Sequence, residues 1–149
     1  MKRLKIAIPL DEKQTIYHQN PFTAPKFAIY NIDVDKQNVQ FTLNNVVESP
    51  WSSSSYKNFK ENTIKCACNK KAQDDINHIC EHYSLLEVIG DCSYLLADHF
   101  CVNTTRALSI GGVTVFKIPS IINRTDLAIK NFLIGASFAN KIQNIHNAS

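Results

Sequence analysis

The period of the hydrophobic pattern changes once along the chain, and this change constrains the fold more than any other feature. Apolar and polar residues alternate over residues 39–47, which is typical of a half-buried β-strand. Over residues 72–89 the apolar residues instead recur every three or four positions, as on one face of a helix. This helical stripe consists of Ile76, Ile79, Cys80, Tyr83 and Leu86. The chain therefore combines an early antiparallel sheet with later helices.

The other strands follow from alternation, short apolar runs and turn residues. Alternation in the first half predicts strands at residues 4–10 and 26–33, and the prolines of the loop between them argue against a helix there. A polar turn at residues 35–38 joins the second strand to the third. Nearly continuous apolar runs predict two later strands, at residues 92–97 and 113–118.

The predicted order is β-β-β-α-β-α-β-α, with further helices at residues 103–110 and from Thr125 or Asp126 onward. Because each of the last two strands is reached through a helix, both run parallel to the first strand. The expected fold class is α/β, with a five-stranded mixed sheet and helices on both faces. A length of 149 residues suits a single domain over residues 1–149.

A polar loop at about residues 48–65 separates the two halves and contains four consecutive serines. Such a loop is either a flexible excursion or a lid in which Trp51, Tyr56 and Phe59 close over a ligand at the sheet edge. The sequence leaves both interpretations open.

Charge and composition exclude several classes of partner. Charged residues make up 19% of the chain, and the net charge of +3 is scattered, so no nucleic-acid-binding surface is expected. The basic start, residues 1–5, resembles the beginning of a signal peptide, but the apolar run at residues 6–10 is too short for one or for a membrane span. We therefore expect a cytoplasmic protein that does not bind a membrane.

All five cysteines and three of the five histidines lie between residues 66 and 101. An odd number of cysteines does not form a closed disulfide framework, whereas thiolate and imidazole groups hold transition metals and iron–sulfur clusters. Ligands in open α/β sheets bind beyond the carboxyl ends of parallel strands, where we expect several of these side chains to meet. The predicted metal ligands are Cys66, Cys68, His99 and Cys101, with His18 as a further cofactor-binding residue.

Each of these residues also has a structural interpretation. Cys66 and Cys68 could be exposed thiols or a redox pair, and His99 could cap a strand end beside a buried cysteine. His78 and His82 are four residues apart and lie off the apolar stripe, which favours a solvated polar face over a bidentate metal site. The two remaining cysteines are expected in the hydrophobic core, Cys80 through the helical stripe and Cys92 through the buried strand.

The sequence predicts no enzymatic activity. Nucleophile elbows, phosphate-binding loops and dinucleotide fingerprints are absent from it. Asp11 and Asp98 follow two strands and could belong to a divalent-metal-dependent phosphodiesterase, but no third acidic residue is obvious. This activity is therefore kept only as an alternative.

Two passages resemble the dinitrogenase iron–molybdenum cofactor biosynthesis family, which includes NifX-like domains and the C-terminal part of NifB. The first combines residues 6–12 with Ala24-Pro25-Lys26-Phe27-Ala28-Ile29-Tyr30, and the second combines Tyr94-Leu95-Leu96-Ala97 with Asn103 and residues 107–116. The resemblance implies a ribonuclease-H-like fold. It also implies a non-catalytic carrier that passes an iron–sulfur or iron–molybdenum-type cluster between assembly and acceptor proteins.

One motif of this family is altered in the chain. The family usually shows His-Phe-Gly-x-Ala-Pro before the second strand, whereas residues 20–25 read Asn-Pro-Phe-Thr-Ala-Pro here. The glycine-rich stretch after the third strand is replaced by the serine loop and by Cys66-Ala67-Cys68. The alternative to a carrier is therefore an interaction domain that keeps the fold and has lost the cluster.

Overall fold

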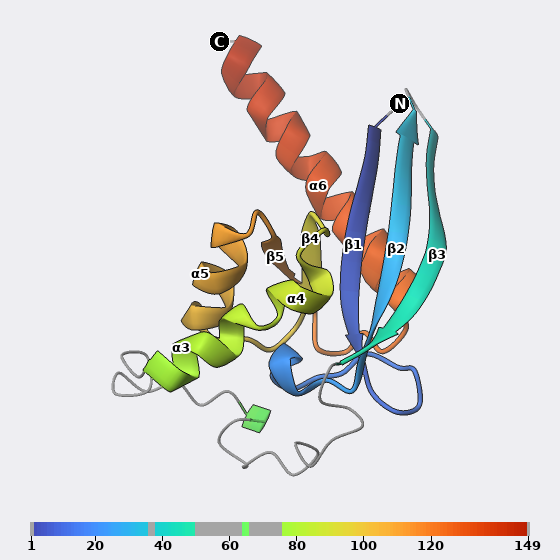
Figure 1. The fold of residues 1–149 in the computed structure, drawn as a ribbon. Helices are drawn as coiled ribbons and strands as arrows, with labels where there is room; N and C mark the ends of the chain where they lie inside the picture. Colours follow the sequence, from blue (N-terminus) through green and yellow to red (C-terminus); the bar gives the residue numbers. More distant parts are fainter. Residues whose placement is uncertain (1, 36–37, 50–63, 66–75, 149) are drawn as a thin grey trace.

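A computed structural model describes residues 2–35, 38–49, 64–65 and 76–148 (Figure 1). Its five strands form one sheet in the order β3-β2-β1-β4-β5. The pairs β1–β2 and β2–β3 are antiparallel, whereas β1–β4 and β4–β5 are parallel. The predicted α/β fold with a five-stranded mixed sheet is confirmed. The strands are β1 (Lys2–Leu10), β2 (Lys26–Asp35), β3 (Asn38–Glu48), β4 (Tyr94–Ala97) and β5 (Thr114–Lys117).

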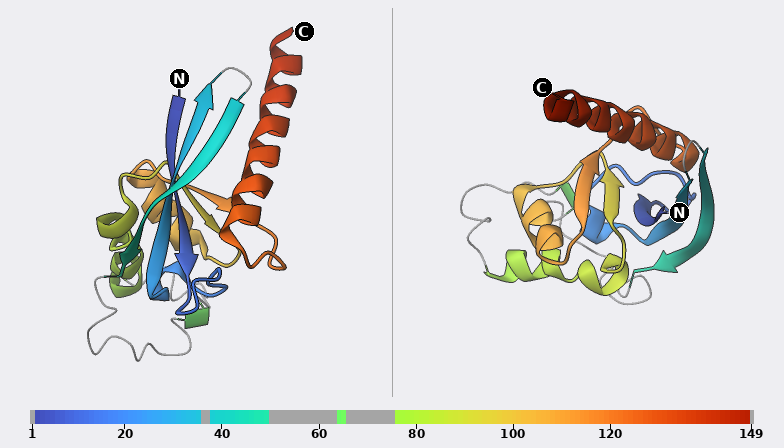
Figure 2. Two further views of the ribbon diagram at one scale, coloured as in Figure 1. Left: turned by 90° about the vertical axis from the view of Figure 1, so that its right-hand side faces the viewer. Right: turned by 90° about the horizontal axis from the view of Figure 1, so that it is seen from above.

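Helices cover both faces of the sheet, as Figure 2 shows from two further directions. One face carries α3 (Ile76–Tyr83), α4 (Leu86–Ile89) and α5 (Val102–Ile110), and the other face carries α6 (Thr125–Ala148). The single helix predicted at residues 72–89 is two helices in its described part. Ser84 interrupts it, because its hydroxyl donates a 2.6 Å hydrogen bond to the Glu81 carbonyl and draws the backbone into a turn.

Alternation along the strands produces two hydrophobic layers, one on each side of the sheet. In β4, the fully buried Leu95 packs towards α4 and α5, and the equally buried Leu96 packs towards α6. Burying such a side chain contributes roughly 1.5–3 kcal/mol. β4 is therefore covered on both faces, as its continuous apolar sequence predicts.

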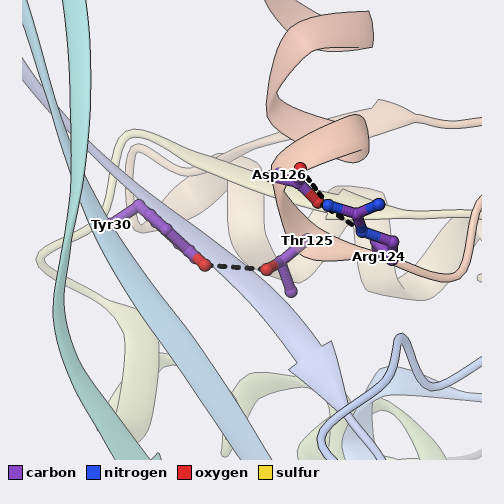
Figure 3. Close-up of polar contacts among 4 residues, drawn as sticks. All are labelled: Tyr30, Arg124, Thr125 and Asp126. Atoms are coloured by element: carbon purple, nitrogen blue, oxygen red, sulfur yellow. Dashed lines mark hydrogen bonds and ion pairs between the residues drawn. The ribbon is translucent and has the colours of Figure 1, made fainter.

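A contact between two side-chain hydroxyl groups joins the start of α6 to the antiparallel part of the sheet (Figure 3). The hydroxyl groups of Tyr30, on β2, and Thr125 lie 2.7 Å apart. Next to them, the Arg124 guanidinium donates two hydrogen bonds to Asp126, at 3.1 and 2.8 Å. Asp126 also places a negative charge in the first turn of the helix, where the helix dipole favours it. These contacts fix the loop between β5 and α6.

A 3-10 helix lies in the loop after β1, so the prediction of no helix there is wrong over Pro21–Thr23. Pro21 occupies the start of this turn, where a backbone N–H would have no partner in the helix. The Asn20 side chain caps the turn by accepting a 3.1 Å hydrogen bond from the Phe22 N–H. Of the helices in the described ranges, none is both long and apolar enough to cross a membrane.

Candidate functional site

The carboxyl ends of β1, β4 and β5 point to the same side of the molecule, because the three strands are parallel. The loops that follow them meet there, below the sheet in Figure 1. We call this side the carboxyl edge. The loops carry His18 after β1, Asp98, His99 and Cys101 after β4, and Asn123 after β5. The topology thus gathers three of the five predicted site residues at one edge.

A cysteine and a histidine, two residue types that bind transition metals, lie close together at this edge. The Cys101 sulfur lies 3.0 Å from Nε2 of His82, which projects from α3 and is completely buried. Cys101 immediately precedes α5 and is partly exposed, and its sulfur also lies 3.6 Å from the Thr104 hydroxyl. The pair therefore joins a partly exposed cysteine to a buried histidine.

The distance between the Cys101 sulfur and His82 Nε2 can be compared with the distance between two ligand atoms that bind the same metal ion. Tetrahedral zinc has bonds of about 2.3 Å to sulfur and about 2.0 Å to nitrogen, which separates the two ligands by about 3.5 Å. At 3.0 Å the thiol and imidazole are hydrogen-bonded to each other. A displacement of about half an ångström would admit a metal ion between them, so this pair fits a two-ligand fragment of a site.

The positions of His82 and Cys80 correct the sequence-based prediction for α3. His82, predicted on a solvated polar face, is buried, whereas Cys80, predicted in the core, is exposed. His82 shares the inward face of the helical segment with the buried Ile89 and with Ile79 and Leu86, which are half-buried. Ile76, assigned to the apolar stripe, is 74% exposed. The helical spacing of Ile79, Leu86 and Ile89 could have indicated that His82 faces the core.

His99 holds a separate segment of the chain. Its Nε2 donates a hydrogen bond to the carbonyl oxygen of Lys65, the residue that directly precedes Cys66 in the sequence. The Asn20 N–H donates a 2.8 Å hydrogen bond to the carbonyl of Ile64. Residues 64–65 are thereby attached to two loops of the carboxyl edge.

Cys66 and Cys68 lie outside the described residues, as do Trp51, Tyr56 and Phe59, so their predicted roles stay predictions.

His18 links all three loops of the carboxyl edge. Its Nδ1 lies 2.8 Å from an oxygen of Asp98, and its Nε2 lies 2.6 Å from the side-chain oxygen of Asn123. Partial burial lowers the pKa of His18, but hydrogen bonds to Asn123 and Asp98 and the charges of Asp98 and Asp11 outweigh it, so the pKa is raised. A protonated imidazole donates to both oxygens, which suits this geometry. Sequence spacing could not reveal Asn123 as a partner of His18.

The carboxylates of Asp98 and Asp11, both at the carboxyl edge, differ in the hydrogen bonds that they accept. The Asp98 side chain is 5% exposed, and its second oxygen has no hydrogen-bond partner among the described residues. Asp11 accepts hydrogen bonds from the N–H groups of Lys13 and Thr15 and from the Thr15 hydroxyl, at 2.9, 3.0 and 2.6 Å. Burial raises the pKa of Asp11, but these hydrogen bonds and the charge of Lys13 outweigh it and lower the pKa. The Asp11 carboxylate thus stabilises its own turn.

The carboxyl edge contains pairs of potential ligands. Across the ranges that the structure describes, no three side chains of the His, Cys, Asp or Glu type lie close enough to hold one metal ion. Cys92 lies away from these pairs in the core, as predicted, where burial raises the pKa of its thiol to about 12. A complete site would therefore require ligands in addition to Cys101 and His82.

Two solved structures are among those similar to this chain. No family model matches the chain, and no curated protein matches it. The crystal structure of PH0822 is 16% identical, covers 76% of this chain and 78% of its own, and has a TM-score of 0.44. The NMR structure of a candidate NifB protein from Thermotoga, of the DUF35 family, is 23% identical, covers 89% of each chain and has a TM-score of 0.46.

Proposed function

We propose that this protein is a small cytoplasmic carrier that binds an iron–sulfur-type cluster or a transition metal ion at the carboxyl edge. The observation that carries the proposal is the contact between the Cys101 sulfur and the buried His82 imidazole. A thiolate and an imidazole are the ligands that iron, zinc and iron–sulfur clusters accept, and both are positioned here before any metal arrives.

In this proposal, Cys101 and His82 provide two of the ligands, and Cys66 and Cys68 complete the set. The attachment of Lys65 to His99 supports it, since Cys66 follows Lys65 directly in the sequence. The resemblance of the strand and turn motifs to the iron–molybdenum cofactor biosynthesis family supports a cluster as cargo. The partners are then proteins that assemble the cluster and proteins that accept it.

The proposed carrier has no catalytic role of its own. Divalent-metal nucleases need several carboxylates free to bind two metal ions. Asp11 is engaged by Lys13 and Thr15, and one oxygen of Asp98 is engaged by His18. These hydrogen bonds favour a binding function over a phosphodiesterase.

A second candidate is an interaction domain that has lost its cargo. It is favoured by the buried turn at residues 20–23, which occupies the place of the family's histidine and glycine. In that case, the hydrogen bond between Cys101 and His82 would stabilise the fold.

Anaerobic reconstitution with iron and sulfide separates the two candidates. A carrier gives a stoichiometric visible chromophore that Cys101→Ser and His82→Gln weaken strongly and Cys66→Ser with Cys68→Ser abolishes. Cys80→Ser is the matched control, because Cys80 is an exposed thiol on the same helix as His82. A folded protein that remains colourless and free of iron would instead identify the interaction domain.

A further inference from the structure

Among the described residues, strand β3 forms an exposed edge of the sheet. It is the outermost strand on its side and is 11 residues long. Edge strands are usually kept from pairing with other chains by charges, prolines, β-bulges or short length. Residues 38–43 contain no charged residue, no proline and no bulge, whereas the opposite edge strand, β5, has four residues and carries Lys117. The two edges therefore differ in their capacity to accept another strand.

An exposed apolar row runs along this edge strand. Val39, Phe41 and Leu43 pair with Val34, Ile32 and Tyr30 of β2, on the face that carries α6. A register shift leaves Asn44 without an opposite residue, so Val46 falls on the same face as the first three. Val39 and Leu43 are 46% and 52% exposed. Helix α6 crosses this face obliquely and leaves the start of β3 uncovered (Figures 1 and 2).

The apolar row on β3 can pair with the same row of a second copy when two-fold symmetry relates the two copies. When two copies of β3 are aligned antiparallel with Phe41 opposite Phe41, Val39 of each copy faces Leu43 of the other. In the same register Gln40 faces Thr42, so polar residues meet polar residues and no like charges are opposed. Since Phe41 lies 6.3 Å from the Tyr30 ring, the two copies would also join their aromatic pairs.

We propose that β3 pairs with β3 of a second copy around Phe41, which joins two five-stranded sheets into one continuous sheet. A second copy fits better than an unrelated peptide, because one symmetric register pairs the whole segment from Val39 to Leu43 with itself. The pairing segment lies at the opposite end of the sheet from the carboxyl edge, since β3 is parallel to β1. Each copy would thus keep its carboxyl edge accessible, and the inference does not depend on the proposed function.

Sedimentation equilibrium from micromolar to near-millimolar concentration tests this inference with a charge-swap pair. The natural protein is expected to reach twice the mass of one chain, and Leu43→Lys and Val39→Glu are each expected to give monomers. The double variant should recover the dimer, because each new lysine then faces a new glutamate of the other copy. These two positions are far apart along one strand, so the rescue cannot arise within a single chain.

Ile110→Lys serves as the control, because Ile110 is a 72% exposed residue of α5 and lies outside β3. It should leave the dimer intact. Circular dichroism should show the same fold for every variant. A natural protein that stays monomeric, single variants that remain dimeric, or a double variant that remains monomeric would each overturn the inference.

Discussion

The Cys101 sulfur lies 3.0 Å from Nε2 of His82, although His82 lies in α3 and Cys101 lies in the loop that precedes α5. One partner is buried and the other is partly exposed, so the contact connects the core under α3 with the solvent-facing carboxyl edge. Loss of this contact should lower the stability of the fold. The surroundings of His18 and Cys92 predict how stability depends on pH and how readily the thiols react.

Replacement of His82 is expected to destabilise the fold. His82→Ala leaves a cavity in the core and removes the hydrogen-bond partner of Cys101, which should lower the free energy of unfolding by roughly 2–4 kcal/mol. The measurement is chemical denaturation monitored by circular dichroism. Cys80→Ala, on the exposed side of the same helix, should change the free energy by less than about 0.5 kcal/mol. Equal effects of the two replacements would contradict the buried position of His82.

The hydrogen bonds of His18 predict a pH-dependent contribution to stability. Its pKa is raised in the folded protein, so the folded state holds the proton more tightly than the unfolded chain. The stabilisation is complete below the unfolded pKa of about 6.5 and is lost as the pH rises through the higher folded value.

Unfolding free energies of the natural protein and of His18→Gln should therefore differ more at about pH 5.5 than at about pH 9. Asn123→Ala should reduce this difference in part, because Asn123 supplies one of the two hydrogen bonds. A gap between the two proteins that widens with rising pH would show that the neutral imidazole is the favoured form.

The described cysteines should differ in their reaction with an alkylating reagent. Cys80 is exposed, whereas burial and the neighbouring Asp91 carboxylate raise the pKa of Cys92 to about 12. Because the thiolate is the reactive form, iodoacetamide at about pH 8 should label Cys80 and leave Cys92 unlabelled until the protein unfolds. Fragment-ion mass spectrometry locates the label. Rapid labelling of Cys92 in the folded protein would place this residue outside the core.

The contact between Tyr30 and Thr125 should be measurable as a coupling energy. Tyr30→Phe and Thr125→Val each remove one hydroxyl of the 2.7 Å pair and should each cost about 0.5–1.5 kcal/mol. The double variant should cost less than the sum, because the second replacement removes a group that has already lost its partner. Strictly additive free energies would mean that the two hydroxyls do not stabilise each other.

The sequence predicts the sheet well because each strand has its own local signal. Alternation marks the antiparallel strands, and the continuous run at Leu95 and Leu96 marks a strand buried on both faces. The sequence does not predict which face of α3 is buried, because a histidine occupies a position on that face. His82 is completely buried there and bonds to a cysteine 19 residues away.

The candidate site is less predictable because its contacts join distant parts of the chain. His18 meets Asp98 and Asn123 across 80 and 105 residues, and no periodicity connects such positions. The topology rule for parallel strands predicts that their loops meet at one edge. Which side chains pair within that edge depends on packing that only the folded structure supplies.

The most direct test of the proposed carrier is X-ray absorption spectroscopy of the protein loaded with zinc as a probe ion. The spectrum should show sulfur at about 2.3 Å and imidazole nitrogen at about 2.0 Å from the metal. Cys101→Ser should remove one sulfur and His82→Gln the imidazole signal, whereas Cys80→Ser should change neither. Identical metal environments in the natural protein and in Cys101→Ser would contradict the proposal.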